Sequence, residues 1–241
     1  MWEFIDKVIY INLDHREDRR QIMQKLFDEG KIPSEKIERF SAIKHDIGII
    51  GCAMGHISIL KKAKEQKWKN VLILEDDLCW VNFEENYKKL EDLILKPFDV
   101  CMLGGLYLEF EDPKINAAFC TNAYIVSSHY YDTLLNNFEH GLKMKLEKPR
   151  IIGPLYSSEQ KKTHYNNLVN QDNIHNVDVY WMKLQMKDNW IGVSMIDQVD
   201  CYSDIYNKTM FRDKEYNSRI IPILMHNLVN PMKYLIANNS I

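Results

Sequence analysis

An apolar run that ends in three consecutive carboxylates constrains the fold of this chain more than any other feature. Val71 to Leu74 are four aliphatic residues in a row, and Glu75, Asp76 and Asp77 follow them directly. A short continuous run of β-favouring residues is typical of a strand buried on both faces in an α/β sheet. Adjacent carboxylates repel one another and resist the loss of water. The pattern therefore predicts either a divalent cation such as Mg²⁺ or Mn²⁺, which prefers hard oxygen ligands, or a solvated turn.

Strand and helix patterns alternate along the first half of the chain, which predicts an α/β fold with a mostly parallel central sheet and helices on both faces. With 241 residues and 46% hydrophobic composition, the chain can bury one large core, so we expect a single domain over residues 1–241. The expected strands are 7–13, 37–40, 71–74, 99–105 and 117–126, and the expected helices are one with an apolar stripe over 22–27, then 52–63, 83–95 and one from Ser127 or Ser128 to Leu135.

Charge and cysteine content disfavour several classes of protein. A formal net charge of -3 gives no reason to expect a nucleic-acid or membrane-surface binder. The first residues lack the pattern of a signal peptide and no apolar run has the length of a membrane span, so we expect a cytosolic protein. Five scattered cysteines without a Cys-x-x-Cys pair indicate neither a disulfide framework nor a zinc site, and we interpret them as core residues.

Three arginines follow the first expected strand. Arg16, Arg19 and Arg20 begin where that strand ends, and ligands of open α/β sheets bind beyond the carboxyl ends of the strands. Guanidinium groups there can hold a diphosphate through paired hydrogen bonds. The alternative is a solvated helix face on which the arginines pair with Glu17 and Asp18.

Small residues surround a histidine in the segment from Gly51 to His56. Gly51 and Gly55 would let the backbone approach a ligand, but they equally suit tight helix packing, which is the simpler interpretation of Gly55. His56 is either a substrate contact or an interior histidine, and the second is commoner for a lone histidine on an apolar helix face. Gly104 and Gly105 are expected at the same sheet edge as the acids.

Several short motifs occur in a fixed order between residues 8 and 130. They are Asn12-Leu13-Asp14, Arg16, Asp18-Arg19-Arg20, Phe40, Ala42, Gly51-Cys52-Ala53, His56, Ile73 to Asp77, Leu103-Gly104 and Thr121 to Ser127. Together they resemble glycosyltransferase family 25, which includes bacterial lipooligosaccharide galactosyltransferases and procollagen galactosyltransferases. The resemblance resumes at Asp178 and at Tyr202 to Ile205. It implies a GT-A type, Rossmann-like fold, a nucleotide-sugar donor, a divalent metal and inversion at the anomeric carbon.

The resemblance also implies roles for individual residues. Asp77, the last acid of the triplet, is the expected ligand of Mn²⁺ or Mg²⁺, and one protein ligand can be enough. His226 is a second candidate metal ligand, with a histidine at the edge of the core as the alternative. The residues expected to contact the UDP-sugar donor are Asn12, Leu13, Arg16, Arg19, Arg20, Glu75, Asp76, Gly104 and Asp204.

Inversion by direct displacement needs a base that takes the proton of the acceptor hydroxyl. Asp178 matches the family's later acid and is our candidate; the alternative is a strand residue that pairs with a lysine. Asp197, Asp200 and Asp204 are competing candidates. Asp204 belongs to a motif that we expect either to cover the donor or to cap a turn.

The sequence therefore predicts a metal-dependent inverting hexosyltransferase that uses a UDP-sugar. Galactose is the favoured sugar, with glucose or N-acetylglucosamine as alternatives, and the acceptor is a glycan, a lipid-linked saccharide or hydroxylysine of a collagen-like protein. A catalytically silent nucleotide-sugar-binding domain of the same fold is the alternative function. Phosphotransfer proteins are disfavoured because their Asp-x-Asp motif is absent at the acids. Two features depart from the family: Gly55 replaces a frequent serine, and residues 140–176 form an insertion, which is either a lid on the acceptor side or a solvated excursion.

Overall fold

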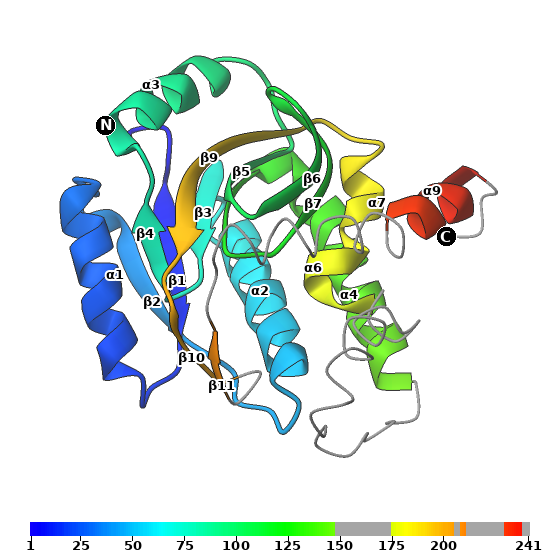
Figure 1. Ribbon diagram of the computed structural model, residues 1–241, viewed down its shortest axis with the longest axis horizontal. Coiled ribbons are helices and arrows are strands. Elements are labelled where there is room, and N and C mark those ends of the chain that lie inside the picture. Colours follow the sequence, from blue (N-terminus) through cyan, green and yellow to red (C-terminus); the bar gives the residue numbers. More distant parts are fainter. Residues whose placement is uncertain (148–174, 205–207, 211–228, 238–241) are drawn as a thin grey trace.

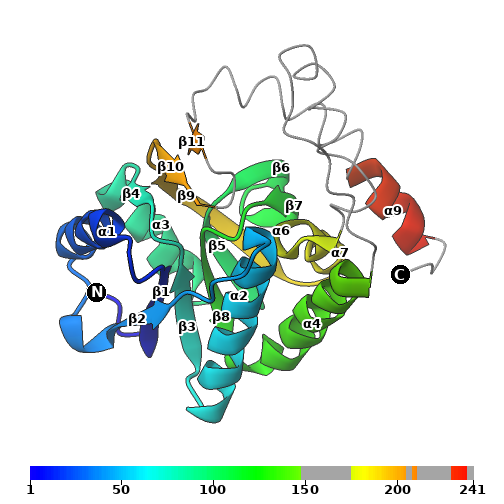
Figure 2. The ribbon, with the colours of Figure 1, turned by 90° about the horizontal axis from the view of Figure 1, so that it is seen from below.

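A computed structural model describes residues 1–147, 175–204, 208–210 and 229–237 of the chain. Within these residues, one nine-stranded sheet forms the centre of the molecule and helices cover both of its faces (Figures 1 and 2). The predicted α/β fold is confirmed. The strands, in their order across the sheet, are β2 (Ile37–Ser41), β1 (Lys7–Asn12), β3 (Asn70–Leu74), β8 (Ala123–Ser127), β5 (Val100–Gly104), β9 (Trp190–Gln198), β7 (Lys114–Phe119) and β6 (Leu106–Glu111), with the short β4 (Leu78–Trp80) paired to β9.

The sheet is more mixed than the mostly parallel sheet expected from the sequence. The β1–β2, β1–β3 and β5–β9 pairs are parallel, whereas β8 runs antiparallel to both β3 and β5. The predicted strand 117–126 is also broken, and it forms two strands, β7 and β8, instead of one. Cys120 lies in this break with a φ of 75°, outside the range of an extended strand. β7 and β8 run in the same direction, and the break takes the chain from the position beside β9 to the position between β3 and β5.

The helices pack on the two faces of the sheet in two hydrophobic clusters. The helices α1 (Glu17–Glu29) and α3 (Phe83–Leu93) contribute buried residues to one cluster, and α2 (Gly48–Glu65) and α4 (Tyr131–Glu147) contribute to the other. Figure 2 shows α2 and α4 side by side along one face of the sheet. The smaller elements are η1 (Ser34–Lys36), η2 (Ser128–Tyr130), α6 (Val177–Tyr180), α7 (Met182–Gln185), α9 (Asn230–Ala237) and a ribbon of β10 (Cys201–Ser203) and β11 (Lys208–Met210).

Alternation along β3 assigns its residues to the two clusters. Val71 and Ile73 pack with α2 and α4, whereas Leu72 and Leu74 pack with α1 and α3. Successive side chains of a strand point to opposite faces of a sheet. The same alternation decides toward which face of the sheet each of the following acids points.

The structure can be compared with two further predictions, those for the segment 140–176 and for Asp178. The first eight residues of the segment 140–176 continue α4 through Glu147, and Asp178 lies in the short helix α6 rather than in a strand. Residues 148–174, and with them the interpretation of this segment as a lid, lie outside the described residues, as does His226.

Candidate functional site

The three consecutive acids enter two different environments. Glu75 continues the alternation toward α2, where its carboxylate accepts hydrogen bonds from Thr121 Oγ1 (3.1 Å) and Gln198 Nε2 (3.3 Å). Asp76 points toward α1 and accepts from Asn12 Nδ2 (2.8 Å) and from Arg19 Nη1 (2.5 Å). We call these the cysteine side (Cys52, His56, Glu75, Thr121) and the arginine side (Asn12, Arg16, Arg19, Asp76, Asp77) of the site.

Arg19 is the central cation of the arginine side. Its guanidinium lies between Asp76 and Asp77, with 3.3 Å from Nη2 to Asp77 Oδ2, and its side chain is 11% exposed. Burial raises the pKa of Asp76, and the positive charge of Arg19 opposes this effect. The buried acids thus obtain their counter-charge from an arginine that the sequence assigned to the donor.

Asp77 is held in place from several directions. Its side chain accepts from Gln198 Nε2 (3.1 Å) and from the thiol of Cys201 (3.5 Å), and its carbonyl oxygen accepts from the backbone N–H of Val199 (2.8 Å). The side chain offers hard carboxylate oxygens and is 8% exposed. These donors suit Mn²⁺ or Mg²⁺ as a single protein ligand, with the diphosphate and water as the remaining ligands.

The other two arginines pair with Asp18 and Glu17, as in the alternative, but Arg16 is buried and does not lie on a solvated helix face. Arg16 binds Asp18 with 2.7 Å between Nη2 and Oδ2, and Arg20 binds the exposed Glu17 at 3.1 Å. Arg20 also donates to the carbonyl oxygen of Asp14 (2.8 Å). Leu13 contributes its carbonyl oxygen, which accepts from the backbone N–H of Arg16 (2.9 Å).

The segment at β10 folds back onto these arginines. Arg16 and Arg19 donate to the carbonyl oxygen of Tyr202 at 3.0 and 2.8 Å, and Arg16 also pairs with Asp204. Burial alone would raise the pKa of Asp204, but hydrogen bonds from Arg16 and His15 hold it below its usual value. The two ends of the family resemblance therefore meet at one place, and Asp204 is part of the arginine network.

The cysteine side lies at the start of α2. Cys52, His56 and Glu75 each place one possible ligand atom within 4.8 Å of the other two. His56 is fully buried, and its Nδ1 lies 2.8 Å from the Tyr124 hydroxyl on β8. The sequence interpretation of His56 as an interior histidine is correct for its burial, but the proximity of Cys52 and Glu75 was not predicted.

Asp178 differs from its competitors in exposure. Its Oδ1 is buried and has no hydrogen-bond partner among the described residues, and burial raises its pKa to about 6. Asp197, Asp200 and Asp204 are exposed. A carboxyl group with a pKa near 6 can exchange a proton close to neutral pH, as a general base requires.

Several residues of the site have buried polar atoms without a partner among the described residues. Among the described residues these atoms include Arg19 Nε, His56 Nε2, Asn122 Oδ1 and Asp178 Oδ1. Buried polar atoms are normally paired, so these atoms are available to a ligand. Gly104 lies in the same region, where an added Cβ would come within 2.6 Å of the Ile196 carbonyl oxygen; close packing of β5 on β9 thus explains this glycine.

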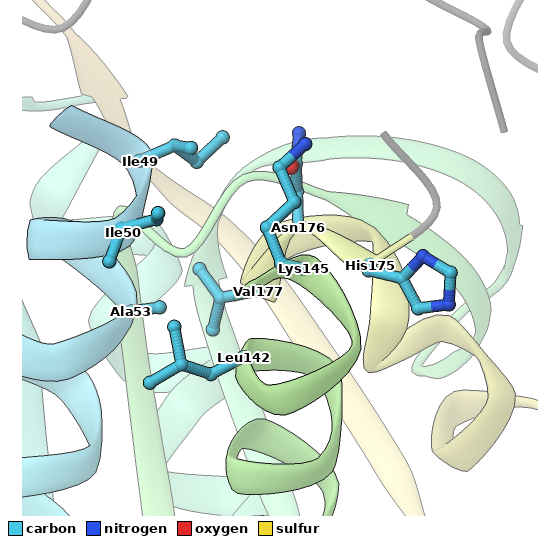
Figure 3. Close-up of a pocket in the computed structure, with 8 residues that line it drawn as sticks. All are labelled: Ile49, Ile50, Ala53, Leu142, Lys145, His175, Asn176 and Val177. Carbon is cyan, nitrogen blue, oxygen red and sulfur yellow. The ribbon is translucent and has the colours of Figure 1, made fainter. Parts of the chain in front are cut away.

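The cavity in Figure 3 is too small for a sugar. It measures about 10 Å³, the room of a single water molecule, and no one of the three acids lines it. Its walls come from α2, α4 and the residues just before α6: Ile49, Ile50, Ala53, Leu142, Lys145, His175, Asn176 and Val177.

Residues that sequence reasoning missed link the elements of the site. Gln198 donates to both Glu75 and Asp77, Thr121 supports Glu75, and Cys201 contacts Asp77. Thr121 already belonged to a family motif, and Cys52 and His56 are four residues apart on one helix face, which was an available signal. Gln198 carried no signal in the sequence.

Comparison with known sequences connects this geometry to a family. The family described as "Glycosyltransferase family 25 (LPS biosynthesis protein)" matches residues 46–117, which contain Cys52, His56 and the acids. A putative glycosyltransferase R655 of Acanthamoeba polyphaga mimivirus is 33% identical over 127 residues, which cover 44% of this chain and 39% of the relative. Procollagen galactosyltransferase 1-B of Xenopus laevis is 26% identical over 161 residues, covering 54% and 26%.

The chain spans less than half the length of these relatives. Solved structures of A197 from STIV and of a PBCV-1 glycosyltransferase involved in glycosylation of the major capsid are similar at TM-scores of 0.45 each. They are 13% and 10% identical and cover 87% and 90% of this chain, and 95% and 98% of their own. No helix within the described residues has the length and apolar character to cross a membrane. The sequence matches confirm the resemblance of this chain to glycosyltransferase family 25.

Proposed function

We propose that this chain is a metal-dependent inverting glycosyltransferase that moves a hexose from a UDP-sugar to an acceptor hydroxyl. The observation that supports this most is the arginine side, where Asp76 and Asp77 lie at the end of a central strand beside Arg16 and Arg19. Ligands of α/β sheets bind at this position, and the unpaired Arg19 Nε offers a donor to an anion. The family resemblance supplies the donor class, with galactose favoured over glucose or N-acetylglucosamine.

The diphosphate would bind where the arginines converge. Arg16 and Arg19 already donate to the carbonyl oxygen of Tyr202, so the segment at β10 lies next to the proposed diphosphate site. Guanidinium groups hold phosphate oxygens through paired hydrogen bonds. A bound diphosphate would compete with Asp76 and Asp77 for Arg19, which couples donor binding to release of the acids.

Once the diphosphate has taken Arg19 away from it, Asp77 would be free to hold the divalent cation. When bound, Mn²⁺ or Mg²⁺ would neutralise negative charge that develops on the leaving diphosphate. Gln198 and the Val199 N–H keep Asp77 in position before any cation arrives.

Asp178 would act as the base. The acceptor hydroxyl oxygen attacks the anomeric carbon, the bond from that carbon to the diphosphate oxygen breaks, and UDP leaves with the electron pair. Asp178 takes the hydroxyl proton. Its pKa of about 6 leaves it largely ionised at neutral pH, ready to accept this proton.

The acceptor is proposed by analogy with the relatives alone. One is a procollagen galactosyltransferase and the matching family is described by LPS biosynthesis. A hydroxyl of a glycan, a lipid-linked saccharide or a hydroxylysine side chain is therefore the acceptor class to test.

Release of UDP tests the proposal. The protein is incubated with Mn²⁺ and a panel of UDP-sugars, with and without a galactose-terminated glycan or a hydroxylysine peptide. We expect UDP release from one donor, stimulated by one acceptor and abolished by a chelator. Donor binding without turnover on any acceptor would indicate the silent nucleotide-sugar-binding domain, and absence of UDP binding would contradict the donor class.

A further inference from the structure

The cysteine side combines three different ligand types in a small volume. Cys52 and His56 lie four residues apart on α2 and so face the same way, and Glu75 approaches from the end of β3. One sulfur, one imidazole nitrogen and one carboxylate oxygen lie within 4.8 Å of one another, close to the spacing of ligands around one ion. Among the described residues, no other group of three such side chains meets this spacing.

The hydrogen bonding of His56 leaves one nitrogen unused. Nδ1 is engaged by the Tyr124 hydroxyl, whereas Nε2 is buried and has no partner in the described part of the chain. Burial lowers the pKa of His56 to about 3, so the imidazole is neutral. A neutral imidazole fixed through one nitrogen by a hydrogen bond is the usual form of a histidine that binds metal through the other.

A bound cation would change the protonation state of Cys52. Burial, Glu75 and Asp178 together raise the pKa of the Cys52 thiol well above its usual value. Arg19 neutralises Asp76 and Asp77 on the opposite side of the strand. A divalent ion would supply positive charge here, and Cys52 would release its proton to solvent on binding it.

We propose that Cys52 Sγ, His56 Nε2 and Glu75 bind a late first-row transition-metal ion, with Zn²⁺ favoured, at a site separate from Asp77. A thiolate, an imidazole and a carboxylate are zinc ligands, and thiolate is a poor ligand for Mg²⁺ or Mn²⁺. Three protein ligands leave one position for water. The ion would tie the start of α2 to the end of β3, and it would fix Glu75 beside Gln198, which also reaches Asp77.

Cobalt spectroscopy on the full chain tests this site without any sugar or turnover, so its result is independent of the proposed activity. The reduced, metal-free protein is titrated with Co²⁺. We expect one equivalent to produce a thiolate-to-cobalt charge-transfer band and tetrahedral visible bands, and Zn²⁺ to displace the cobalt. Absence of the charge-transfer band in the wild-type protein would overturn the proposal.

Variants assign the sulfur ligand. Cys52→Ser and His56→Gln should each weaken Co²⁺ binding at least tenfold, and Cys52→Ser should also abolish the charge-transfer band. Cys79→Ser, a half-buried cysteine on β4, should keep both. Circular dichroism checks the fold of each variant, and two independent ligand variants keep the test decisive if one of them unfolds.

Cys201 provides the sharpest control because its sulfur lies 3.5 Å from Asp77 Oδ2. If cobalt bound at the arginine side instead, Cys201→Ser and Asp77→Asn would remove the band and Cys52→Ser would not. That outcome would contradict the proposed site. We expect the reverse, with Asp77→Asn retaining the full cobalt spectrum.

Discussion

The arginine side and the cysteine side begin one residue apart in the sequence, but their carboxylates have different partners. On the arginine side, Asp76 and Asp77 are each about 6% exposed and share the guanidinium of Arg19. On the cysteine side, Glu75 has the neutral donors Thr121 and Gln198 and lies near a thiol and an imidazole. The first side carries its own counter-ion, and the second side brings a thiol and an imidazole to its carboxylate.

The two sides would therefore bind a metal ion in different ways. A site that is already neutralised must exchange its internal cation for an external one, so binding there is coupled to a rearrangement of Arg19. On the cysteine side, His56 Nε2 has no partner among the described residues, so an ion there would displace a proton of Cys52 but no arginine. The acidic triplet is therefore one feature of the sequence but two sites in space.

The largest effect is expected from Asp77→Asn. Loss of the proposed cation ligand should lower metal-dependent turnover by about 10²–10³-fold, because charge on the leaving diphosphate is no longer neutralised. UDP release in Mn²⁺ measures the change, and circular dichroism should be unaltered. Asp92→Asn, an exposed acid on α3, is the matched control and should keep wild-type activity. Full activity of Asp77→Asn would remove the functional distinction between the two sides.

Arg19→Met tests the internal counter-ion. The substitution leaves two buried carboxylates without their cation, and the free energy of unfolding should fall by about 3 kcal/mol. Urea denaturation measures it. Arg20→Met, whose partner Glu17 is exposed, should change the same quantity by less than about 0.5 kcal/mol. Equal effects of the two variants would show that Arg19 does not stabilise the acids.

Asp178→Asn tests whether the buried carboxyl group of Asp178 makes the stability of the protein depend on pH. The folded pKa of about 6 exceeds the unfolded value of about 3.9, so the folded protein holds this proton more tightly. Its contribution to stability is complete below about pH 4 and is lost as the pH rises through about 6. Wild type should therefore lose about 2 kcal/mol relative to Asp178→Asn over this range, after allowance for partial exposure.

Denaturation curves of both proteins between these pH values measure the difference. A difference that does not change with pH would contradict the raised pKa. If Asp178 is also the base, kcat/KM of the wild type should rise with pH through about 6, and the asparagine variant should lack this rise.

The smallest effect is expected from Gln198→Leu, which removes a side chain that donates to both sides. Glu75 keeps Thr121 and Asp77 keeps Arg19, so turnover should fall only about fivefold, or ~1 kcal/mol. Gln24→Leu on the exposed face of α1 is the control. A loss as large as that of Asp77→Asn would mean that Gln198 itself contacts the substrate and that the two sides work as one.

Local patterns predicted the fold around the acids well. The run Val71 to Leu74 is the central strand β3, and the acids lie at its carboxyl end. The split of the triplet was also implicit in the sequence, since Glu75 shares the alternation of Val71 and Ile73 and Asp76 that of Leu72 and Leu74. The alternation alone did not show which helix covers each face of β3.

Long-range contacts could not be predicted in this way. Gln198 reaches the acids because β9 pairs with β4, where Gln198 lies opposite Leu78. The place of β8 in the sheet depends on the break at Cys120, where the chain leaves β7. Neither depends on a local period of hydrophobicity. The interpretation of Cys52 as a core residue failed to anticipate its neighbours for the same reason, because Glu75 approaches it from another element.

The position of β9 has a consequence for how the chain is made. This strand lies between β5 and β7 in the sheet, yet it is synthesised after both of them. Until residue 198 has left the ribosome, β5 has an open edge, the β6–β7 hairpin has no strand to join, and Asp77 lacks Gln198. Pairings between distant segments form slowly and expose strand edges in the meantime. Completion of the sheet and completion of the candidate site are thus a single late event in biosynthesis, so a nascent chain cannot acquire the arranged acids before its central strand is in place.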